Sequence, residues 1–286
     1  MNDPQTNAVS GQGPEAADGH AQVTMPVYFV THGGGPWPWV PQWLPWHAQL
    51  AQSLRAMPAQ IGQRPRAVLL ISAHWEEAEF TVQTAARPAM LYDYSGFPAD
   101  TYAVQYPAAG DPELASQVTA LLQGAGMVCA QDGQRGFDHG AFVPLHLIYP
   151  QADVPVVQLS LRASLNAGEH LALGRILAPL RKQGVLILGS GASYHNMRTF
   201  GPAGHAPSKL FDDWLARTLM ELPAAQRSQQ LAEWTRAPAA RIAHPREEHL
   251  LPLMVAVGAA GEDAAQRVFH QHGFMDSATV SSYRLG

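Results

Sequence analysis

Short aliphatic runs alternate with helical patterns along most of this chain, and this alternation restricts the fold more than any other feature. Aliphatic and β-branched residues form strand-length runs at residues 27–31, 67–72, 79–84, 154–161, 185–189 and 267–272. Between these runs apolar residues recur at helical spacing, for example at Leu50, Leu54 and Met57, which indicates amphipathic helices. A sheet covered by helices produces this pattern. We therefore expect an α/β fold with a central, mostly parallel sheet flanked by helices.

Two longer segments complete this expected fold. The segment 86–112 is rich in Tyr, Pro, Gly and Asp, and a loop of this length in a compact domain usually has a function. We expect it to lie over a binding site. The segment 211–256 is expected to be mostly helical. Its last helix should begin near Pro245, because proline suits the first turn, and should kink at Pro252, where a backbone hydrogen bond is lost.

The composition fits one domain that acts on a small molecule. A chain of 286 residues with 47% hydrophobic residues can bury a large core. Residues 1–23 are polar and lack the apolar run of an export signal. We expect a disordered tail there, and residues 24–286 to form a catalytic domain.

Charge and cysteine content exclude several classes of partner and site. The net charge of -5 and the absence of a Lys/Arg-rich run argue against nucleic acid and anionic membranes as partners. No apolar stretch approaches the ~20 residues of a membrane span. A single cysteine, Cys129, excludes an intramolecular disulfide. We expect a cytoplasmic protein.

Three histidines lie near the ends of predicted strands. His32 follows VYFVT, His74 closes AVLLISAHW, and His195 follows VLILGSG within GSGASYHN. Ligands of α/β folds bind at the carboxyl ends of strands, although a lone histidine there is more often structural. Three at one edge favour a site, because neutral imidazoles bind metals and accept protons near pH 7.

Two further histidines follow a different pattern. His139 lies in RGFDHGAF, where Asp138 is suited to cap a helix, and an ordinary turn with a solvated histidine is the simpler interpretation. His249 lies in PREEHLLPL. Glu247 and Glu248 need no function there, since carboxylates stabilise a helix N-terminus. His249 lies beside an apolar stripe, and a buried imidazole needs a partner or a metal.

Several segments, taken in order, resemble the DOPA 4,5-dioxygenase branch of the class III extradiol ring-cleaving dioxygenases. They are THGGGPWPW, ISAHWE, YDYSGFP, residues 102–112, RGFDHGAFVPL, GSGASYHNMR and PREEHLLPLMVAVGA. The resemblance runs from about Tyr28 to the C-terminus. No single segment identifies the family, but all seven segments in this order indicate it strongly.

The resemblance implies an α/β fold that binds one divalent metal ion through His32, His74 and His249. It also implies that His195 and His139 flank the substrate. His195 would be the acid/base, and His139 would contact a substrate oxygen. The substrates would be a catechol-type aromatic molecule and O2.

The implied ligand set has no carboxylate, unlike the two-histidine, one-carboxylate set of many oxygen-activating iron enzymes. Iron(II) is the expected catalytic metal, and zinc(II) is possible, because catalytic zinc has three protein ligands and an open position. Glu248 should point away from the metal, since neighbouring helix residues are turned about 100° apart. Trp75, Tyr92 and Phe97 are candidate substrate contacts, although each is also compatible with core packing.

Other functions use parts of the same pattern. HGGG also occurs in lipases and esterases, but the chain lacks their G-x-S-x-G nucleophile segment. GSGAS lacks the third glycine and the acidic partner of a dinucleotide loop. A zinc hydrolase is the main alternative, because His32, His74 and His249 could activate water with His195 as the base. A non-catalytic metal-binding protein would not require two further histidines.

Overall fold

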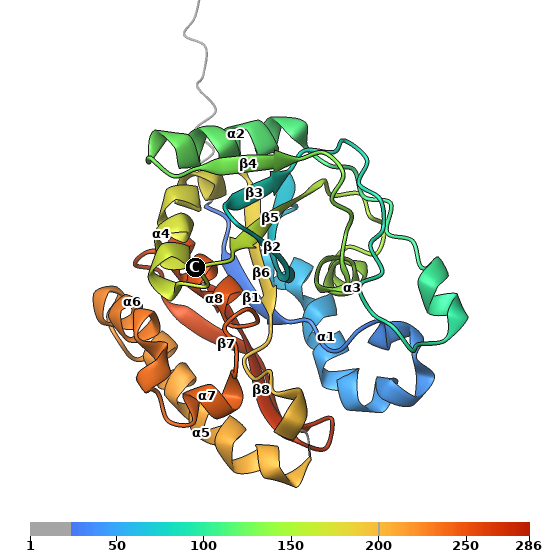
Figure 1. Ribbon diagram of the computed structural model, residues 1–286, viewed down its shortest axis with the longest axis vertical. Helices are drawn as coiled ribbons and strands as arrows, with labels where there is room; N and C mark the ends of the chain where they lie inside the picture. Colours follow the sequence, from blue (N-terminus) through green and yellow to red (C-terminus); the bar gives the residue numbers. More distant parts are fainter. Residues whose placement is uncertain (1–23, 200) are drawn as a thin grey trace, which may run out of the picture.

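The computed structural model describes residues 24–199 and 201–286. The tail expected at residues 1–23 lies outside this part of the chain. The strands form one eight-stranded sheet between helices (Figure 1). They are β1 (Val27–Thr31), β2 (Ala67–Glu77), β3 (Phe80–Gln83), β4 (Cys129–Asp132), β5 (Val156–Arg162), β6 (Val185–Gly191), β7 (Ala265–Phe274) and β8 (Ala278–Leu285).

The centre of the sheet is parallel. The strand order is β4-β3-β5-β2-β6-β1-β8-β7. Strands β5, β2, β6 and β1 run parallel, while β8 is antiparallel to both β1 and β7. Strands β1 and β6 are buried along their whole length, as expected of parallel strands covered on both faces. The expected α/β fold is confirmed, and the carboxyl ends of β1, β2 and β6 lie at one edge.

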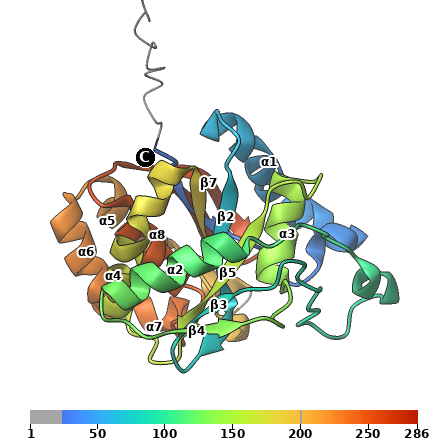
Figure 2. The same cartoon turned by 90° about the horizontal axis from the view of Figure 1, so that it is seen from above.

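Helices cover both faces of the sheet. They are α1 (Leu44–Ile61), α2 (Pro112–Gly124), α3 (His139–Ile148), α4 (Ala167–Leu177), α5 (Pro202–Met220), α6 (Ala224–Ala232), α7 (Ala240–Ala243) and α8 (Leu251–Ala260). Figures 1 and 2 show α1 and α3 on one side and α4, α5 and α6 on the other. No helix formed by the described residues combines the length and apolar character that a membrane-crossing segment needs.

The final helix differs from the sequence-based prediction. Helix α8 begins at Leu251, and residues 245–250 form turns, so Glu248 and His249 precede the helix. Pro252 lies in the first turn of α8, where its missing N–H removes no helical hydrogen bond. The predicted kink is therefore wrong.

The segment before α8 lies directly on β6. The N–H of Ala192 donates to the carbonyl of His249 (3.0 Å). A Cβ atom on Gly191 would lie 2.1 Å from that carbonyl oxygen. Glycine at this position therefore allows the His249 segment to approach the strand, which explains one glycine of the GSG sequence without a bound nucleotide.

Candidate metal centre

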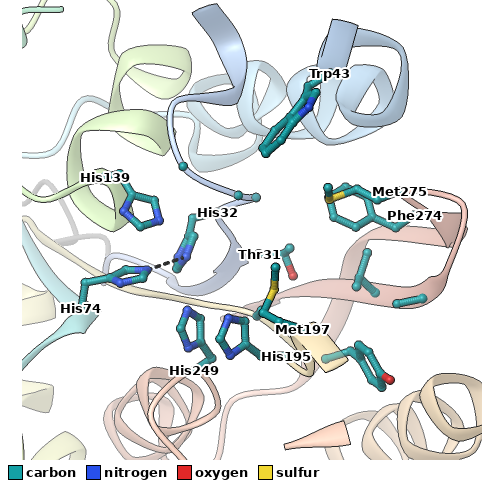
Figure 3. A pocket seen from close by; sticks show the side chains of 17 residues that line it. Thr31, His32, Trp43, His74, His139, His195, Met197, His249, Phe274 and Met275 are labelled. Atoms are coloured by element: carbon teal, nitrogen blue, oxygen red, sulfur yellow. Dashed lines mark hydrogen bonds between the residues drawn. The ribbon is translucent and has the colours of Figure 1, made fainter. Parts of the chain in front are cut away.

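A cavity of about 290 Å³ lies at the carboxyl edge formed by β1, β2 and β6. The structure brings to this cavity all the histidines singled out in the sequence. They are His32, His74, His139, His195 and His249. Figure 3 shows their imidazoles gathered on one side of it.

His32 follows β1 and is 2% exposed. Its carbonyl accepts a hydrogen bond from Trp37 Nε1 (2.9 Å), and its Nδ1 lies 3.1 Å from Ser190 Oγ. Because the Ser190 hydroxyl donates its proton to the carbonyl of Gly140, its oxygen can only accept from the ring. His32 therefore carries its proton on Nδ1, and Nε2 offers a lone pair.

His74 lies inside β2 rather than at its end. The strand continues to Glu77, so the expected end at residue 72 is wrong. Its pairing with β5 is irregular between Ile71 and Glu76, and such irregularities redirect side chains near active sites. The Nε2 atom of His74 lies 3.1 Å from Nε2 of His32.

Asp93 connects two of the imidazoles. Its Oδ1 accepts hydrogen bonds from the backbone N–H (2.9 Å) and Nδ1 (2.8 Å) of His139, and its Oδ2 lies 3.5 Å from His74 Nδ1. Burial would raise the pKa of Asp93, but the hydrogen bonds from the side chain and backbone of His139, together with the charge of that ring, outweigh it and lower the pKa. His139 is 6% exposed at the start of α3, which excludes the solvated interpretation. As expected, Asp138 caps this helix through the N–H of Ala141.

Glu248 connects a second pair of imidazoles, those of His195 and His249. Its Oε1 lies 3.0 Å from Nδ1 of His249 and 3.4 Å from Nδ1 of His195. The rings of His195 and His249 are stacked, with centroids 3.4 Å apart and planes inclined by 15°. The helical argument that separated Glu248 from His249 does not apply, because neither residue is in a helix.

Burial keeps the imidazoles of His32, His74 and His249 neutral at ordinary pH. Burial, followed by the charges of neighbouring histidines, holds the pKa of His32 and that of His74 well below the usual range. Burial lowers the pKa of His249 to about 4, although the hydrogen bond with Glu248 opposes this shift. For Glu248 burial acts to raise the pKa, but hydrogen bonds from His195 and His249 outweigh it and hold the pKa well below its usual range. The site combines neutral imidazoles with ionised carboxylates.

The sequence matches the model of the LigB family, described as the catalytic LigB subunit of aromatic ring-opening dioxygenase, over residues 41–286. The chain belongs to this family. It is 43% identical over 227 residues to a 4,5-DOPA dioxygenase extradiol from Beta vulgaris, covering 78% of this chain and 84% of that protein. It is 38% identical over 263 residues to the dioxygenase tasH from Hapsidospora irregularis, covering 85% and 80%.

A solved structure shares the LigB fold of this chain. An uncharacterised protein from Escherichia coli K12 superposes with a TM-score of 0.73 at 29% sequence identity, covering 92% of this chain and all of that one. Because the LigB family is one of aromatic ring-opening dioxygenases and the relatives are named extradiol dioxygenases, this chain is an enzyme of the extradiol dioxygenase class. Membership implies a small aromatic substrate and O2. The hydrolase alternative is not favoured.

The LigB family and the converging imidazoles together imply a metal ion. Ligand atoms of His32, His74 and His139 lie within 4.8 Å of one another, and those of His195, Glu248 and His249 form a second such group. The donor chemistry fits a cation. The Nε2 lone pair of His32 points at Nε2 of His74, 3.1 Å away. Such a short distance between two ring nitrogens is favourable only when a proton or a cation lies between them.

The outer nitrogens of the rings also fit a metal site. Metal-binding histidines almost always donate their second N–H to a carboxylate, a carbonyl or water. Here Glu248 lies next to Nδ1 of His249, and Asp93 lies next to Nδ1 of His74. The hydroxyl of Ser190 accepts from Nδ1 of His32. The Nε2 atoms are thereby left for an ion.

The aromatic substrate contacts expected from sequence are not part of the cavity wall that the described residues form. Trp75 is buried beneath the guanidinium of Arg135, 5.1 Å from the ring centroid. Tyr92 donates its hydroxyl proton to the carbonyl of Val104. Phe97 packs behind the wall, against Trp43, with ring centroids 5.3 Å apart. Trp75, Tyr92 and Phe97 thus lie outside the described lining of the cavity, and their role as substrate contacts stays a prediction.

Two kinds of site residue were missed in the sequence. Asp93 belongs to the long loop 86–112, and nothing local connects it with His139. The other wall of the cavity includes Phe274, Met275 and Val280 from the β7–β8 hairpin. The motif YDYSGFP, which contains Asp93, was the available signal for Asp93. Of the hairpin, the strand at residues 267–272 was predicted and corresponds to β7, whereas β8 was not predicted.

Proposed function

We propose that this protein opens the ring of a catechol-type substrate beside its two hydroxyl groups and inserts both atoms of O2. The convergence of five imidazoles in a largely apolar cavity supports this proposal most directly. Residues 24–286 form the catalytic domain in this proposal. We place the enzyme in the cytoplasm, which suits a chain with one cysteine.

His32, His74 and His249 are the proposed metal ligands. Their ring centroids form a nearly regular triangle, with sides of 5.0 Å, 4.9 Å and 5.4 Å. Three imidazoles that bind one ion must be spaced about equally around it. Each also has a hydroxyl or carboxylate near Nδ1 that would leave Nε2 for the ion.

His195 is the proposed acid/base. It is stacked parallel to His249, so the two in-plane lone pairs run side by side and do not converge on one ion. Glu248 holds Nδ1 of His195 at 3.4 Å, which leaves Nε2 to accept a proton from a substrate hydroxyl. His139 is held in the same way by Asp93, and its Nε2 is available to a second substrate oxygen.

Iron(II) is the proposed catalytic metal, and zinc(II) is the alternative occupant. When bound, either ion would act as a Lewis acid toward the substrate oxygens, and iron(II) would in addition supply the redox chemistry that O2 requires. The protein's contribution is to hold neutral ligands and exclude water. It also keeps proton-accepting nitrogens next to the substrate.

Oxygen uptake tests this proposal. Anaerobically purified protein is loaded with iron(II) or zinc(II), its metal content is measured, and O2 consumption is followed with a panel of catechols. We expect the iron form to consume one O2 for each catechol and to form a yellow ring-opened semialdehyde. Absence of both across the panel, together with ester or amide hydrolysis by the zinc form, would show that the hydrolase alternative is correct.

A further inference from the structure

The cavity has two chemically different sides. The histidines occupy one side, and Figure 3 shows Trp43, Phe274 and Met275 across from them. Val280 belongs to the same hairpin as Phe274 and also lines the cavity, and we call this second side the apolar wall. The apolar wall comes mainly from the β7–β8 hairpin.

The apolar wall offers no charge to a substrate. Among the described residues that line the cavity, none is Lys, Arg, Asp or Glu. Asp276 follows Met275 but accepts a hydrogen bond from Trp46 Nε1 (2.9 Å). Asp93 and Glu248 are held by the histidines on the opposite side. A charged substituent would therefore leave water without gaining an ion pair, which is unfavourable.

The orientation of the substrate places its substituent against this wall. The proposed ligands and proton acceptors all lie on the histidine side, so the catechol oxygens must face that side. The opposite edge of the ring then faces Phe274, Met275 and Val280. A volume of about 290 Å³ is near the lower end of small-molecule sites, which suits one ring with a compact substituent.

We propose that the substrate is a catechol with an uncharged, apolar substituent, such as a short alkyl chain, rather than an amino acid or a carboxylic acid. This inference depends on the proposed function, because the orientation follows from catechol binding at the histidines. It separates this chain from the relatives named for DOPA, a substrate that carries both an ammonium and a carboxylate group.

A matched set of catechols tests the inference on the full chain loaded with iron(II). The set comprises 4-methylcatechol, 4-propylcatechol, 3-(3,4-dihydroxyphenyl)propionate, the methyl ester of that acid, and L-DOPA. We expect kcat/KM to rise about fourfold for each methylene between the methyl and propyl compounds. The ester should exceed its acid by at least about tenfold, since only the acid carries a charge to the apolar wall.

Binding gives a second readout that needs no turnover. Calorimetric titration of the zinc-loaded protein should give the same order of affinities, with the ester above the acid. Met197→Lys adds a cation at an exposed position of the cavity lining, 68% accessible, and should reduce the ratio of ester affinity to acid affinity. Leu210→Lys, at an exposed position on α5 outside the cavity lining, is the matched control and should leave the ratio unchanged.

The outcomes distinguish a failure of the inferred substrate class from a failure of the proposed ring-opening function. If the acid or L-DOPA is cleaved as well as the neutral compounds, the inferred substrate class is wrong and the ring-opening function stands. Backbone N–H groups of Gly33–Gly35, which also line the cavity, would then be the anion contact. If no catechol is cleaved, the proposed function fails, and the affinities of the zinc form still decide the substrate class.

Discussion

Replacing His249 by alanine, in parallel with His139→Ala, separates the two possible ligand sets. His32 and His74 are common to both sets, and their Nε2 atoms are 3.1 Å apart. The third ligand is His249 in the proposed function, whereas the group of ligand atoms that lie within 4.8 Å of one another and include His32 and His74 is completed by His139. The two variants therefore give opposite outcomes.

The expected magnitude follows from the contacts of each ring. Loss of an outer partner of a metal ligand already weakens binding by about 10- to 100-fold. Loss of His249 removes one imidazole nitrogen and also leaves Glu248 without one of its two histidine partners. We expect zinc affinity to fall by more than about 100-fold, or about 2.7 kcal/mol. His139→Ala leaves the proposed ligands in place and should change the affinity by less than about tenfold.

Competition against a chelator measures zinc affinity without oxidation of the metal. His272→Ala is the control, because it removes an exposed histidine whose Nε2 lies 3.0 Å from Nε2 of His270, a surface pair that could bind excess zinc. Circular dichroism of the metal-free proteins must show that each variant is folded, since His249 is 4% exposed. If His139→Ala loses zinc while His249→Ala retains it, the inference from the triangle of rings is refuted.

The remaining predictions test the surroundings of the ligands and the stability of the fold. Glu248→Gln should weaken zinc binding about 10- to 100-fold, measured by the same competition; an unchanged affinity would contradict its role as the partner of Nδ1. His195→Ala should keep its metal and lower turnover by about 10² to 10⁴; loss of the metal would identify a fourth ligand. Gly191→Ala should destabilise the protein by about 1 to 3 kcal/mol in urea unfolding, because its Cβ would lie 2.1 Å from the carbonyl oxygen of His249, and a neutral effect would mean that the segment shifts easily. Burial lowers the pKa of His170 to about 4, below the unfolded value near 6.5, so the unfolded chain binds more protons and stability is lost as pH falls through this window. Between pH 7 and pH 5 the metal-free protein should lose about 2 kcal/mol more than His170→Gln, and equal losses would show that His170 is not responsible.

The positions of His32 and His195 follow from local sequence. Each lies after a run of buried β residues, VYFVT or VLILGSG, and parallel central strands end at the same edge of a sheet. His74 was placed less accurately. Its strand extends through Glu76 and Glu77 because these residues pair with β5, and such pairing depends on a partner far away in the sequence.

Strand β8 of the β7–β8 hairpin was missed because its polar residues are paired rather than solvated. Ser282 Oγ accepts the N–H of Thr31 (3.0 Å), and Ser281 Oγ donates to Asp212 (2.6 Å). Without knowledge of these partners, the serines of β8 indicate a loop. The apolar wall of the cavity depends on this hairpin, so the substrate class could not be inferred from the sequence.

Two carboxylates from different parts of the chain hold the histidines of the site in pairs. Asp93 lies beside His74 and His139, and Glu248 lies beside His249 and His195. Each carboxylate thus holds one proposed ligand and one proposed substrate-facing histidine. Each carboxylate therefore orients one ring of either kind, and replacing it should change both metal affinity and turnover.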